Sequence, residues 1–170
     1  NMLNDYQIAE INVARMKGVN IDDPIMKEFV DNLDPINQLA EQSEGFIWRL
    51  QSESGNSTDI DVGGQPLFLA NMSLWESADA LFEYVYKSMH TKVMVQRRHW
   101  FEKPQELYQV LWWVRAGHLP PVQEGLDRLE VLKRNGPCPE AFTFKRQFPS
   151  PGDSIEPEGR EPAPYCSGWD

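Results

Sequence analysis

The chain has 170 residues, of which 41% are hydrophobic, and its formal net charge is −10 at pH 7. This length fits one domain with a sizeable core and makes a second full domain improbable. No apolar run approaches the roughly 20 residues that span a bilayer, and the acidic charge disfavours nucleic acid and anionic membranes as partners.

Three segments in the first half of the chain are rich in β-branched and aromatic residues and predict strands: residues 6–16, 46–51 and 66–75. A helix is expected between the first two, with Asp23 as its N-cap and Gly45 as its stop. At Asp34-Pro35 this helix either kinks or starts anew. The polar loop over residues 52–64 has the length of a loop that covers a pocket mouth.

The second half begins with a helix that Ser77 caps and that breaks or bends around Ser88. Residues 107–114 predict a fourth strand, and a further helix is expected from Pro121 to Gly136. The sequence AFTF at residues 141–144 predicts a short strand that closes the sheet.

We divide the chain into one domain over residues 1–148 and an acidic, proline-rich tail over residues 149–170. Cys138 and Cys166 lie on either side of a proline-rich segment, so reduced thiols are expected rather than a disulfide. The N-terminus lacks a basic start followed by an apolar block, which predicts a cytoplasmic location.

The order strand, helix, strand, strand, helix, strand predicts an α+β fold, a ferredoxin-like sandwich with an antiparallel sheet. The helices of such a sandwich cover one face, whereas strands such as residues 110–114 are apolar on both faces. We therefore expect a homodimer in which two sheets face each other as a dimeric α+β barrel. An elongated monomer with a wet second face is the alternative.

The segment over residues 88–101, SMHTKVMVQRRHWF, is the most informative for function. Because each helical residue turns by 100°, one helix would place His90, Arg97 and Phe101 within about 60° of one another, on a stripe that also holds Met94. This pattern is typical of a pocket wall, with His90 as general acid or base and Arg97 as stabiliser of a developing oxyanion. The alternative is an amphipathic helix in which His90 is a hydrogen-bonded core residue and Arg97 closes an ion pair.

Candidate substrate-binding residues lie on the predicted strands and in the turn after the fourth strand: Asn71, Ser73, Trp48, Trp75, Trp113 and His118. Asn71 and Ser73 are expected on one face of their strand, where Asn12 and Arg49 join them in orienting a ligand or in a structural polar network. The tryptophans either fill the core or enclose a flat aromatic substrate.

The sequence contains no His-x-x-x-His or His-x-Glu spacing and no Gly-rich phosphate loop. We therefore expect no metal site and no dissociable cofactor. A haem held by a single histidine is the remaining alternative.

Motifs along the chain resemble family 3291 of the domains of unknown function: INVAR (11–15), GFIWRL (45–50), LANMSLWES (69–77), YKSMH (86–90), RRHWF (97–101) and LWWVRAGHLP (111–120). The resemblance spans residues 6–148 and implies a dimeric α+β barrel related to antibiotic-biosynthesis monooxygenases. Where members of the family usually have proline after LWWV, this chain has Arg115.

With the clustered tryptophans, this resemblance implies a small-molecule enzyme of secondary metabolism. Its substrate is expected to be an aromatic or polyketide-like hydrophobic metabolite, held between sheet and helices. Isomerisation, cyclisation and cofactor-free oxygenation all fit. The alternatives are a non-catalytic binding protein for a hydrophobic small molecule and a structural dimer.

Overall fold

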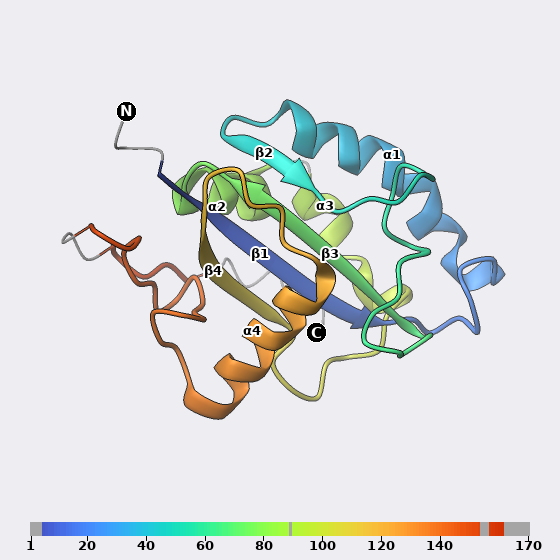
Figure 1. The fold of residues 1–170 in the computed structure, drawn as a ribbon. Helices are drawn as coiled ribbons and strands as arrows, with labels where there is room; N and C mark the ends of the chain where they lie inside the picture. The colour runs from blue at the N-terminus through green and yellow to red at the C-terminus, as the bar shows by residue number, and fades with distance from the viewer. Residues whose placement is uncertain (1–4, 89, 154–156, 162–170) are drawn as a thin grey trace.

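The computed structural model describes residues 5–88, 90–153 and 157–161, with the side chains of residues 90 and 91 outside the description. Its elements follow in the order β1 (Tyr6–Arg15), the 3₁₀ helix η2 (Pro24–Met26), α1 (Lys27–Gln42), β2 (Phe46–Arg49), β3 (Phe68–Trp75), α2 (Ala78–Lys87), α3 (His90–Met94), the 3₁₀ helix η3 (Arg97–His99), β4 (Gln109–Arg115) and α4 (Val122–Asn135). The architecture is therefore mixed α/β, and Figure 1 shows helices on both sides of the sheet.

The four strands form one antiparallel sheet in the order β2-β3-β1-β4. The predicted strands are confirmed, with ends that differ by a few residues. In the register, Asn12 on β1 lies opposite Asn71 on β3 and Gln109 on β4, and Glu10 lies opposite Ser73. Because side chains of alternate residues share a face, these five polar side chains all point to the same side of the sheet.

Helices α1 and α2 cover that side of the sheet at its β2 end. A cluster of buried apolar side chains includes Trp75, whose ring stacks on Tyr84 of α2 with 5.0 Å between centroids. The start of α2 is confirmed, because the side chain of Ser77 accepts a hydrogen bond of 3.1 Å from the backbone nitrogen of Ala80. This packing fixes α2 over β3.

Helix α4 covers the other face, as Figure 1 shows. Leu129 and Leu132 of α4 join a buried cluster with side chains from β1, β3 and β4, and Val62 from the loop after β2 belongs to the same cluster. A Cβ added to Gly125 would lie 2.6 Å from Cδ1 of Ile11, so the helix backbone approaches β1 closely. The apolar face that motivated the homodimer is thus covered by the chain's own helix.

The segment over residues 88–101 is not one helix, contrary to the sequence-based expectation. Ser88 has an extended backbone, and its hydroxyl donates to the carbonyl of Tyr84 in place of a continued helix. The short helix α3 and the 3₁₀ helix η3 follow as separate elements. The turn of 100° per residue, which would place His90 and Arg97 on one stripe of a continuous helix, therefore does not apply to this segment.

The structure also shows where α1 begins and how the AFTF segment contacts the sheet. Asp23 caps η2, accepting a 3.1 Å hydrogen bond from the nitrogen of Ile25, and α1 then continues through Pro35 without a new start. Of the expected AFTF strand, Phe142 forms a single bridge with Leu111 of β4. In the described part of the chain, none of the helices has the length and hydropathy to cross a bilayer.

Candidate functional site

A pocket of about 140 Å³ lies between the sheet, α1 and the segment that carries α3 and η3. Its apolar wall comes mainly from the helices and from the residues after η3: Phe29, Leu33, Ile36, Val93, Met94, Trp100 and Phe101. Its polar lining includes Asn12, Asn32, Asn37, Arg49, Asn71, Arg97 and Tyr108. Residues 56–58, from the loop expected to cover a pocket mouth, also line it.

Tertiary contacts hold one end of the pocket in place. Trp100 and Phe101 are buried, and the ring of Phe29 from α1 lies 5.7 Å from that of Trp100 and 5.0 Å from that of Phe101. The nitrogen of Lys17 donates to the carbonyl of Trp100, and that of Glu102 donates to the carbonyl of Arg15. These contacts tie the chain after η3 to the end of β1.

The electrostatics of the pocket differ from those of the whole chain. Of the described residues that line it, two are arginines and none is aspartate or glutamate, although the chain has 26 acidic residues. Nη2 of Arg97 donates a 3.0 Å hydrogen bond to the hydroxyl of Tyr108, and Nε of Arg49 donates to Glu41 at 3.2 Å. The lining therefore favours a ligand with an anionic or electron-rich oxygen.

Glu10 lies beneath this lining with only 3% of its surface exposed. Its Oε2 accepts hydrogen bonds from Nδ2 of Asn12 at 2.9 Å and from Nε2 of Gln109 at 2.8 Å. Burial raises the pKa of Glu10 to about 7, against the opposing effect of the two amide donors. Burial and the charge of Glu10 also raise the pKa of the nearby Tyr84 phenol.

Two of the predicted site residues line the pocket. Arg97 reaches it from η3 and Asn71 from β3. Met94 and Phe101, expected on the same stripe as Arg97, also line it although no single helix carries them. His90 opens α3, but its side chain lies outside the described part of the chain.

Four other candidates are away from the lining and have structural partners. Nε1 of the fully buried Trp75 donates to the hydroxyl of the buried Ser73 at 2.9 Å, which satisfies two polar groups within the core. Trp48 packs against the core under α4. Nε1 of Trp113 donates to the carbonyl of Phe148 at 2.9 Å. These contacts favour the structural alternative for all four side chains.

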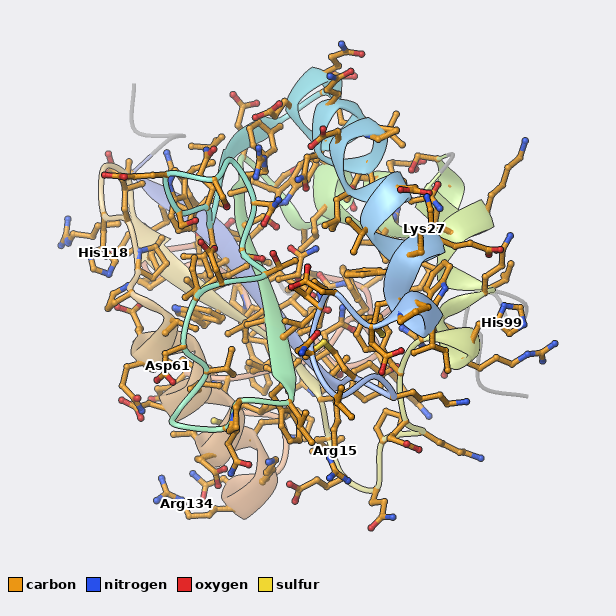
Figure 2. The ribbon with its side chains drawn as sticks, turned by 90° about the vertical axis from the view of Figure 1, so that its right-hand side faces the viewer. Arg15, Lys27, Asp61, His99, His118 and Arg134 are labelled. Carbon is orange, nitrogen blue, oxygen red and sulfur yellow. The ribbon has the colours of Figure 1, made fainter. Side chains whose placement is uncertain are left out.

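The second histidine candidate, His118, belongs to the opposite face of the sheet. Nε2 of His118 lies 2.7 Å from Oε1 of Glu124, whose Oε2 accepts a hydrogen bond from Nε1 of Trp112. Figure 2 shows His99 and His118 on opposite sides of the molecule. Among the described residues, no three His, Cys, Asp or Glu side chains gather in a way that could hold a metal ion.

Sequence reasoning missed Glu10 and Tyr108. A signal for Glu10 was present, because a single acidic residue stands between Ala9 and Ile11 in a strand that is otherwise apolar at its centre. Tyr108 carried no comparable signal, since its contact with Arg97 depends on how the chain returns to the sheet.

Comparisons with known proteins give the chain a family but no activity. The family described as Domain of unknown function (DUF3291) matches residues 7–158. No curated protein matches the chain. A crystal structure of the NE2512 protein of unknown function from Nitrosomonas europaea is similar at 12% identity and a TM-score of 0.44, covering 69% of this chain and 98% of that one.

Proposed function

The chain belongs to the DUF3291 family, and from its pocket we propose that it binds and converts an aromatic or polyketide-like hydrophobic metabolite. The observation that carries this proposal is the combination of an apolar wall with two arginines and several amides in one small pocket. Isomerisation, cyclisation and cofactor-free oxygenation are the reaction classes that we propose.

The size and wall of the pocket support a ring-shaped ligand. An apolar cavity of about 150 Å³ holds one benzene molecule, so about 140 Å³ suits a single aromatic ring. The rings of Phe29, Trp100 and Phe101 offer flat apolar contacts for it. A larger metabolite would extend from this ring toward the exposed Asn71.

The polar lining supports an oxygen substituent on that ring. The guanidinium of Arg97 lies 5.3 Å from the ring centroid of Tyr108, and their hydrogen bond holds it at the pocket. A guanidinium has five N–H donors, so it binds a carboxylate or a developing enolate while it keeps its phenol partner. We retain His90 as the proposed acid or base, because α3 carries it and Val93 and Met94 of the same helix line the pocket.

The test compares two neighbouring arginines with benzoate and toluene as probes. Arg97→Gln should bind benzoate about tenfold or more weakly than the wild type, because a charged hydrogen bond is lost, and should bind toluene equally well. Arg98→Gln is the matched control, since Arg98 is exposed and does not line the pocket. Equal loss of benzoate binding in both variants, with circular dichroism showing both folded, would contradict the proposed role of Arg97.

A non-catalytic binding protein is the second candidate. It is favoured by the chemistry of the described lining, whose polar groups are amides, hydroxyls and guanidiniums, while the carboxyl of Glu10 lies buried beneath it. Native mass spectrometry and an absorbance spectrum of freshly purified protein report a retained metabolite or a haem. Recovery of such a metabolite unchanged after prolonged incubation would favour binding over conversion.

The relation to antibiotic-biosynthesis monooxygenases and the dimeric α+β barrel remain part of the proposal. The strand order β2-β3-β1-β4 supports a ferredoxin-like sandwich. A homodimer would use surface that α4 leaves open, because α4 already packs on β1, β3 and β4. Light scattering decides this point, and a strictly monomeric species at micromolar concentration would contradict both the barrel and a purely structural dimer.

A further inference from the structure

We propose that Glu10 is a positioning residue of this pocket: it turns the amide of Asn12 so that Oδ1 faces the ligand, which selects a ligand with a hydroxyl or N–H donor. The inference rests on the proposed function of the pocket and narrows its ligand to a hydroxylated aromatic or enolic ring. The evidence lies in the hydrogen bonds beneath the pocket lining.

The carboxylate of Glu10 sets the direction of the two amides beside it. An ionised carboxylate only accepts hydrogen bonds, so each amide beside it must present its nitrogen. Oε2 of Glu10 has two such neighbours, Asn12 at 2.9 Å and Gln109 at 2.8 Å. The register fixes this arrangement, because Asn12 and Gln109 lie opposite each other on adjacent strands.

Among the described residues, the amide oxygen of Asn12, Oδ1, has no partner of this kind. With Nδ2 directed at Glu10, Oδ1 points away from the carboxylate, and Asn12 lines the pocket. No side chain or backbone group in the described part of the chain donates to Oδ1. Oδ1 is not among the buried polar atoms that lack a partner, so it is open to a donor in the pocket, which is water in the empty pocket and a ligand hydroxyl or N–H in the occupied one.

The orientation of the Asn12 amide depends on whether Glu10 is ionised. A protonated carboxyl can donate to an amide oxygen, which lets the Asn12 amide turn over and present its nitrogen to the pocket. The pKa of Glu10, raised to about 7 by burial, puts this change near neutral pH. Preference for a donor-bearing ligand should therefore rise with pH through that range.

Other titratable groups face the site from each neighbouring element. Tyr84 lies on α2, and Arg49 on β2 pairs with Glu41 on α1. From β4 the neighbours of Glu10 are Gln109 and Leu111, neither of which titrates. On β3 the neighbour is Ser73, so Glu10 is the acid in direct contact with Asn12.

Calorimetry with phenol and toluene tests the inference, because the two probes differ by one hydrogen-bond donor. In the wild type, the preference for phenol over toluene should be about tenfold at about pH 8 and should fall severalfold at about pH 5. In Glu10→Gln, which keeps the shape without the charge, the preference should not change with pH. An unchanged preference in the wild type, or the same pH dependence in the variant, would overturn the inference.

A second readout needs no ligand and separates this inference from the proposed function. The side-chain NH₂ signals of Asn12 in an NMR spectrum should titrate with a midpoint near pH 7 in the wild type and not in Glu10→Gln. If neither probe binds, the proposed pocket function fails, and absence of this titration independently overturns the role of Glu10. Should Glu10→Gln not fold, Asn12→Leu must abolish the pH-dependent preference for phenol.

Discussion

The buried carboxyl of Glu10 should make the fold less stable above neutral pH, and Glu10→Gln should remove that loss. The pKa in the folded chain is about 7, above the ordinary value of 4.5, so the folded state holds the proton more tightly than the unfolded state. The stabilisation from this proton is complete below about pH 4.5 and is lost as the pH rises through 7. At about 1.4 kcal/mol per pKa unit, the difference between 4.5 and 7 amounts to about 3 kcal/mol.

Urea unfolding followed by circular dichroism measures this effect in the wild type and in Glu10→Gln. Subtracting the two free energies of unfolding at each pH removes contributions that both proteins share. Between about pH 4 and pH 8, the free energy of unfolding of Glu10→Gln should rise relative to that of the wild type by up to about 3 kcal/mol. Glu44→Gln, at an exposed position, is the control for loss of a carboxylate. A difference for Glu10→Gln that stays flat across this range would refute the burial of an ionisable Glu10.

Three further predictions concern stability and use the same unfolding assay. Gly125→Ala should lower the free energy of unfolding by about 1–3 kcal/mol, because the added methyl would clash with Ile11. Adding Ile11→Val should recover part of this loss. An unchanged free energy of unfolding in Gly125→Ala would contradict the close packing of α4 on β1. Ser77→Ala should cost about 1 kcal/mol by removing the cap of α2, and an unchanged midpoint would contradict the cap. Trp112→Phe should lower the free energy of unfolding by more than about 1 kcal/mol, because the lost hydrogen bond to Glu124 and the cavity left by the smaller ring in this fully buried position add; no loss would contradict both the bond and the burial.

Local chemistry made much of the fold predictable from the sequence. The strands carry runs of β-branched and aromatic residues, and Ser77 caps a helix through contacts within its own first turn. The break of this helix near Ser88 was expected, and the hydroxyl of Ser88 donates to the carbonyl of Tyr84 there. The division of residues 90–99 into α3 and η3 was not predictable, because the pattern of apolar residues does not show where a helix tightens into a 3₁₀ turn. The sequence of an apolar strand also does not show which element buries its second face. In this fold that element is α4.

The candidate site was predictable in part for the same reason. Asn71 was found because strand alternation fixes its face. Arg97 was found from a helical stripe that the structure does not contain, since the chain around η3 brings it to the pocket by another route. Glu10 was missed although its place between Ala9 and Ile11 was a signal, since one of its two amide partners, Gln109, lies 99 positions later in the chain. Whether a tryptophan fills a core or contacts a ligand depends on such distant neighbours.

The strand order has a consequence for how the chain is made. Among the strands of the sheet, β1 is synthesised before the others, and both of its partners, β3 and β4, come much later in the chain. Until β4 is synthesised, one edge of this apolar strand has no neighbour within the sheet, and α4 follows later still. Pairing over such separations is slow, so the apolar side chains of β1 are exposed until β3 and β4 have been synthesised. We expect chaperones that bind extended apolar segments to bind the nascent chain at β1.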